Sequence, residues 1–115
     1  MDLLKCKMYY NNYEVFFMSE EFIFRVLAIV EEIPFGKVST YKQIAILAGR
    51  YNNARLVGKI LSISEFYGDY PCHRVVNGDG KLAPMFTEQR DLLKKEGITF
   101  KSNGNVDLKK HLWKV

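Results

Sequence analysis

The feature that most constrains the fold is a pair of short helix patterns joined by a glycine-containing turn in the middle of the chain. Thr40 is a typical helix N-cap, and Gln43, three residues later, completes a capping box. Gly49 suits the left-handed stop after the first helix, and Asn52 or Asn53 can cap the second. The apolar stripe of this second helix consists of Leu56, Val57, Ile60 and Leu61. The pattern predicts a helix-turn-helix.

A further helix is predicted on each side of this pair. Ser19 is the expected N-cap of the earlier one, with Glu20 and Glu21 near the positive end of its dipole. Thr87 is the expected N-cap of the later one, which ends at Glu96. The apolar spacing of the earlier helix is carried by Phe22, Val26, Ile29, Val30 and Ile33, before Pro34 and Gly36 end it.

The remaining segments complete a mainly α fold with a small β component. Residues 74–76 are a short β-branched run, and residues 77–80 are a strong turn signal. Residues 1–18 are expected to form an extended lead-in, with a hairpin turning at Asn11-Asn12. Residues 19–115 are expected to be one compact helical domain, winged-helix-like and monomeric, since 115 residues support one core of modest size.

The positive charge is concentrated in one segment. The net charge is +4, and no Asp or Glu occurs from Ile33 to Ser64. The basic residues in this segment are Lys37, Lys42, Arg50, Arg55 and Lys59. Such a segment would attract a polyphosphate backbone, although a solvated lysine face is an equally open interpretation of the charge alone.

Composition also bears on location and on metals. No apolar stretch is long enough to span a membrane, and the first residues lack a secretory signal, so we expect a cytoplasmic, nucleoid-associated or nuclear protein with no membrane partner. Cys6 and Cys72 are then both expected to be free thiols. With only His73 and His111 to join them, they match no zinc spacing, and we expect neither a metal nor a cofactor.

Cys72 followed directly by His73 is a candidate nucleophile with its base, because an imidazole nearby lowers the pKa of a thiol and the thiolate attacks carbon. From the spacing alone, a buried cysteine beside a structural histidine is the commoner arrangement. The segment that contains the pair is Pro71-Cys72-His73-Arg74-Val75-Val76.

This segment resembles the active-site signature of the 6-O-alkylguanine-DNA alkyltransferases, the methylated-DNA–protein-cysteine methyltransferases. The resemblance covers residues 20–100 and includes residues 33–41, 54–58 and 92–97. It implies that Cys72 accepts an alkyl group irreversibly from 6-O-alkylguanine in double-stranded DNA. It also implies that His73 takes the thiol proton through water and that Glu96 orients His73.

The same resemblance implies a DNA-binding role for the second helix of the pair. Tyr41 would face the flipped nucleotide, and Arg55 would fill the gap left in the duplex. Their alternatives are an ordinary helix-start residue and an ordinary phosphate contact. Small residues at Ala54 and Gly58 would allow close approach to DNA or equally to another helix. Further contacts are expected from Lys59 and Arg74.

Three departures from the family pattern favour a second interpretation. We expect the larger N-terminal domain of many family members to be missing, Ser64 replaces an asparagine, and the loop at residues 81–86 is short. The related alkyltransferase-like proteins have a similar tail to residues 109–113 and bind alkylated guanine without repairing it. They carry a different residue, often Trp or Ala, in place of the cysteine.

Because this chain retains Cys72, we expect single-turnover alkyl transfer, with recognition alone as the alternative. A transcription regulator would leave the Cys72-His73-Glu96 set unexplained. A cysteine hydrolase lacks an evident oxyanion-hole motif here.

Overall fold

The computed structural model describes residues 19–115, and its first element is a long amphipathic helix. Helix α3 spans Glu20–Glu32, and the backbone N–H of Phe22 donates to the Ser19 hydroxyl at 3.2 Å. This contact confirms Ser19 as the N-cap. The apolar side of α3 is buried, and Ile33 is the C-cap residue before Pro34.

The helix pair follows directly, which confirms the helix-turn-helix. Helix α4 spans Tyr41–Leu47 and helix α5 spans Ala54–Ser62. Gly49 in the turn between them has φ +87°, the left-handed conformation that glycine adopts most readily.

The two predicted caps of this pair are only partly correct. The N–H of Gln43 donates to the Thr40 hydroxyl at 3.0 Å, but the reciprocal half of the capping box is missing. The side chain of Gln43 binds the Ser39 hydroxyl and the Trp113 carbonyl instead, because these groups lie inside the fold within its reach. Asn53 is the N-cap residue of α5, yet its side chain makes no capping hydrogen bond.

The second half of the chain consists of short elements. These are the 3-10 helices η1 (Ser64–Phe66) and η2 (Cys72–Arg74), strand β2 (Val75–Val76), helix α6 (Gln89–Lys95) and helix α7 (Leu108–His111). Strand β1 (Ser39–Thr40) pairs with β2 in parallel. The predicted N-cap at Thr87 is wrong: the backbone closes the turn before α6 itself, with Gln89 N donating to Phe86 O at 3.1 Å, and Glu88 is the N-cap residue.

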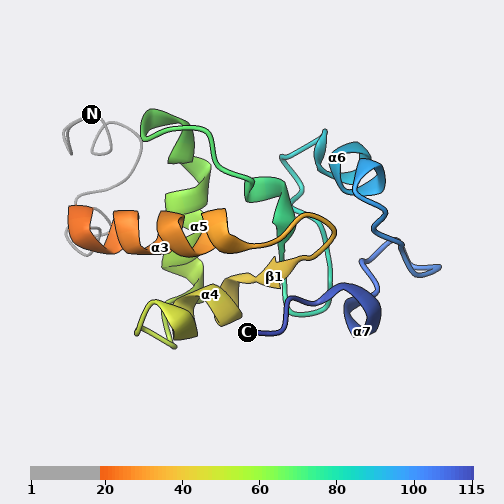
Figure 1. Cartoon of the computed structure of the whole chain (residues 1–115), viewed down its shortest axis with the longest axis horizontal. Helices are drawn as coiled ribbons and strands as arrows, with labels where there is room; N and C mark the ends of the chain where they lie inside the picture. Colours follow the sequence, from red (N-terminus) through yellow and green to blue (C-terminus); the bar gives the residue numbers. More distant parts are fainter. Residues whose placement is uncertain (1–18) are drawn as a thin grey trace.

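Two apolar clusters lie on either side of the strand pair. Figure 1 shows α3, α4 and α5 gathered on one side of β1, with α6 and α7 on the other. The first cluster includes Phe22, Val26, Ile44, Val57 and Ile60, and the second consists of Val38, Val76, Leu93, Ile98 and Val106. Val75 belongs to the first cluster and Val76 to the second, since neighbouring residues on a strand face opposite sides.

The C-terminal segment closes against β1. Val38 N donates to His111 O at 2.9 Å, and Trp113 N donates to Val38 O at 2.7 Å. None of the helices in residues 19–115 has the length and apolar character needed to cross a membrane. The hairpin predicted at Asn11-Asn12 and the thiol of Cys6 lie outside the described residues.

Candidate functional site

A cavity of about 560 Å³ opens between α5, η2 and the loop that precedes α6. This volume lies in the range of pockets that hold small organic groups. Its walls include Tyr41, Gly58, Ser64, Asp69, Tyr70, Cys72, Ala83, Met85, Phe86 and Gln89. The cavity therefore combines aromatic and apolar surface with a few polar groups.

Tyr41 and Gly58 form one wall, where α4 meets α5. A Cβ at Gly58 would lie 3.8 Å from the Tyr41 ring, so the ring packs directly on the helix backbone. Burial raises the pKa of the Tyr41 phenol, and the nearby Cys72 adds to this effect. The phenol therefore keeps its proton at neutral pH and can donate a hydrogen bond into the cavity.

Cys72 forms the opposite wall as the first residue of η2. Its Sγ lies 3.1 Å from the Ser64 hydroxyl, at the start of η1. Burial raises the pKa of the Cys72 thiol, although the hydrogen bond with Ser64 opposes the rise and the charge of Asp69 adds to it. The thiol is therefore the dominant form at neutral pH, which makes it a poor nucleophile.

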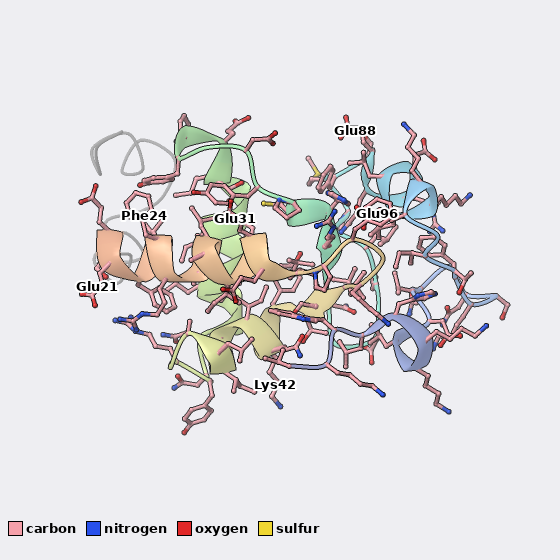
Figure 2. All side chains as sticks on the ribbon, viewed as in Figure 1. Glu21, Phe24, Glu31, Lys42, Glu88 and Glu96 are labelled. Atoms are coloured by element: carbon pink, nitrogen blue, oxygen red, sulfur yellow. The ribbon has the colours of Figure 1, made fainter. Side chains whose placement is uncertain are left out.

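His73 and Arg74 both bind Glu96, at the end of α6. The His73 imidazole donates from Nε2 to Glu96 Oε2 at 2.6 Å, and the Arg74 guanidinium donates from Nε at 3.0 Å. The backbone N–H of Gly36 donates to the same carboxylate at 2.8 Å. Figure 2 labels Glu96 beside α6, and its side chain is only 6% exposed.

The pKa of Glu96 reflects these contacts. Burial by itself would raise it, but the hydrogen bonds from Gly36, His73 and Arg74, together with the positive charge of Arg74, outweigh burial and lower it. The carboxylate is therefore ionised. Through these contacts, Glu96 at the end of α6 connects the loop after α3, which contains Gly36, to η2, which contains His73 and Arg74.

Only some of the residues singled out from the sequence meet at the cavity. Tyr41, Gly58 and Cys72 line it. His73 and Glu96 form a hydrogen-bonded pair that does not line the cavity. On α5, Arg55 is exposed and Ala54 and Lys59 are half-buried, and none of these three lines the cavity.

Arg74 is held inside the protein. Besides Glu96, its guanidinium donates from Nη1 to the Ile33 carbonyl at 2.9 Å and lies 5.8 Å from the centre of the Phe35 ring.

Residues 19–115 contain no group of three or more His, Cys, Asp or Glu side chains that could hold a metal ion.

Gln89 and Met85 are among the cavity residues that the sequence analysis did not predict as site residues. Gln89 is completely buried and Met85 is 93% exposed, and both line the cavity. No local pattern marks Gln89, because its partners lie up to 16 residues away. Met85 belongs to the short loop that the sequence analysis noted as unlike that of the alkyltransferases.

The chain matches known proteins along most of its length. A DNA base-flipping protein from Vibrio parahaemolyticus is 36% identical over 97 residues, covering 82% of this chain and 97% of that protein. Alkyltransferase-like protein 1 from Schizosaccharomyces pombe is 34% identical over 104 residues, covering 83% and 96%. Its crystal structure with damaged DNA containing O6-carboxymethylguanine superposes with a TM-score of 0.75, at 34% identity over 85% of this chain and 99% of that chain.

These relatives correct the expectation that the chain is a single-turnover methyltransferase. The proteins that match it nearly end to end are named for base flipping or as alkyltransferase-like. A methylated-DNA–protein-cysteine methyltransferase from Saccharolobus islandicus is 44% identical, but over only 60% of this chain and 46% of its own length. A cysteine at position 72 is therefore not sufficient to identify a methyltransferase.

Residues 21–98 match the family described as 6-O-methylguanine DNA methyltransferase, DNA binding domain. This match covers more than half of the chain and includes the helix pair, η2 and α6. The chain therefore belongs to the family of the 6-O-methylguanine DNA methyltransferase DNA-binding domain, as do the base-flipping and alkyltransferase-like proteins that it resembles over almost their whole length.

Proposed function

We propose that this protein binds duplex DNA, holds an extruded 6-O-alkylguanine in the cavity between Tyr41 and Cys72, and leaves the alkyl group in place. The protein then marks the lesion for another repair pathway. The observation that carries the proposal is the cavity itself, which adjoins the second helix of the pair and is large enough for a small organic group.

The charges around the cavity suit a flipped base better than a phosphate. Glu65 and Asp69 line the cavity, and their carboxylates repel the DNA backbone. Lys42 on α4 and Arg55 on α5 are exposed, and Figure 2 labels Lys42 on the outer side of α4. The backbone would follow these cations while the uncharged base enters the cavity.

The chemistry of Cys72 supports binding without transfer. Burial raises the pKa of the thiol, which favours its protonated form, and the sulfur forms a hydrogen bond with Ser64. The neighbouring imidazole of His73 is bound to Glu96. In this arrangement Cys72 serves as a wall of the cavity.

The first test compares two duplexes that differ only at one base, guanine or 6-O-methylguanine, at a stated salt concentration. Fluorescence anisotropy should give tighter binding to the methylated duplex. A 2-aminopurine placed beside the lesion should brighten on binding, because extrusion of the neighbour unstacks it. Equal affinity for both duplexes would contradict the proposal.

The second test is intact-mass analysis of the protein after prolonged incubation with excess methylated duplex. We expect an unchanged mass. A gain of one methyl group would contradict the non-covalent part of the proposal. Cys72→Ser serves as the matched control, since it keeps the size of the side chain and should retain the affinity for the methylated duplex.

A further inference from the structure

Gln89 is a completely buried amide whose hydrogen-bonding groups are all directed at backbone. Its Oε1 accepts from Ala83 N at 2.8 Å, and its Nε2 donates to His73 O at 3.0 Å and to Val75 O at 2.9 Å. Among residues 19–115, no buried side-chain nitrogen or oxygen lacks a partner. A buried amide without hydrogen-bond partners is unfavourable, so loss of any of these three contacts would destabilise the buried position of the Gln89 side chain.

The three contacts join two segments that line the cavity, the loop before α6 and the segment from η2 to β2. Ala83 belongs to the loop that contributes Met85 and Phe86 to the cavity. The two carbonyls belong to the segment that contains Cys72, since His73 lies in η2 and Val75 begins β2. The Gln89 side chain, which itself lines the cavity, therefore connects the loop to the backbone of the segment that follows Cys72.

We propose that Gln89 is a positioning residue that fixes the separation between the loop and the Cys72 turn, and so sets how well the cavity distinguishes an alkylated guanine from guanine. This inference rests on the proposed function, because it assumes that the cavity receives the base. Gln89 acts through the backbone that it holds. The Met85 side chain of this loop is almost fully exposed.

The chemistry of the contacts explains why an amide is needed. One partner is a donor and two are acceptors, so the side chain must accept on one side and donate twice on the other. A protonated glutamic acid could accept from Ala83 and donate once. An ionised glutamate could only accept, and it would face two carbonyl oxygens at close range.

The test uses Gln89→Glu and measures the ratio of affinities for the guanine and 6-O-methylguanine duplexes from pH 5.5 to 8.5. We expect the variant to discriminate nearly as well as the parent at the acidic end, where the buried carboxyl group holds its proton. The ratio should then fall by roughly tenfold as this group ionises and the loop separates from the turn. The parent protein should show no such fall.

Gln43→Glu is the matched control, because Gln43 is also an amide that binds the Trp113 carbonyl but does not line the cavity. It should keep the parent's ratio across the same pH range, even if it unfolds more easily. If loss of a buried amide lowered the affinity ratio only by destabilising the fold, Gln89→Glu and Gln43→Glu would lower it alike.

Gln89→Met supplies a second measurement that does not depend on burying a charge. Methionine matches the length of glutamine and fills the same space without hydrogen bonds. Circular dichroism would establish that the variant is folded, and its ratio should then be lowered at every pH. A folded Gln89→Met with the parent's ratio would overturn the inference. Failure of the parent itself to distinguish the duplexes would instead overturn the proposed function.

Discussion

The Ser64 hydroxyl, at the start of η1, lies 3.1 Å from the sulfur of Cys72, which is eight positions later in the sequence. The hydroxyl at this position was noted from the sequence only as a departure from the alkyltransferase pattern. The structure gives it a partner, the thiol in the cavity wall. Burial therefore raises the pKa of the Cys72 thiol, and the hydrogen bond with Ser64 lowers it.

Titration of the thiol should reveal this balance. Because burial raises the pKa of Cys72, its reaction with iodoacetamide should remain slow until the pH exceeds the ordinary thiol pKa of about 8.5. Ser64→Ala removes the hydrogen bond that opposes burial, so it should move the midpoint of the thiol titration upward. Mass spectrometry in a Cys6→Ser background would measure the rate. A downward shift would show that the hydroxyl does not stabilise the thiolate.

The phenol of Tyr41 should contribute to binding of the base. Tyr41→Phe keeps the ring against Gly58 but removes the hydroxyl of this cavity-lining residue, which could bind a base. We expect affinity for the methylated duplex to fall by about five- to tenfold, with little change in thermal stability. Anisotropy would measure the affinity. Tyr51→Phe, at an exposed tyrosine in the turn of the helix pair, should change nothing.

Arg55 should matter more for duplex than for single-stranded DNA. Its exposed place on α5 is compatible with filling the vacancy left by an extruded base, and Arg55→Ala should weaken binding to the methylated duplex by about tenfold. A single strand with the same lesion has no vacancy and should lose much less affinity. Equal losses would identify a phosphate contact. Lys101→Ala, at an exposed lysine outside the cavity, is the control.

Glu96 should make the fold sensitive to acid. The folded state lowers the pKa of this carboxyl group below its unfolded value of about 4.3. Its contribution to stability is therefore present above the unfolded pKa and is lost as the pH falls through the folded pKa. Urea unfolding should show a free energy of unfolding that declines from about pH 5 toward pH 3.

Glu96→Gln should remove part of this decline. At pH 7 the variant should be less stable by about 2 to 3 kcal/mol, because it loses the ionic contacts of a nearly buried carboxylate with His73 and Arg74. The exposed Glu31 on α3, labelled in Figure 2, provides the control. Glu31→Gln should leave both the stability and its dependence on pH close to those of the parent.

Sequence patterns predicted the features that depend on near neighbours. Ser19 and Thr40 each accept from an N–H three residues later, so the chain segment itself contains both partners. Gly49 likewise satisfies a local backbone requirement. The helix pair and the family membership followed from such patterns.

Contacts across the fold escaped prediction. Gln43 could reach either its own helix or the distant Trp113 carbonyl, and only the tertiary structure selects the second. Gln89 is similar, because its three partners come together only when the loop folds over η2. At the site, the sequence placed Cys72 beside His73 but gave no indication that burial would favour the protonated thiol.

The assignment of Val75 and Val76 to different apolar clusters has a consequence for how this protein can vary. Inserting or deleting one residue between the sulfur and the strand would exchange the sides that these two valines face, and each would meet a cluster shaped for the other. A substitution at position 72 would leave the two valines in place, whereas a change in its spacing from the strand would not. The packing of Val75 and Val76 therefore restricts insertions and deletions between Cys72 and β2 more than it restricts the identity of residue 72.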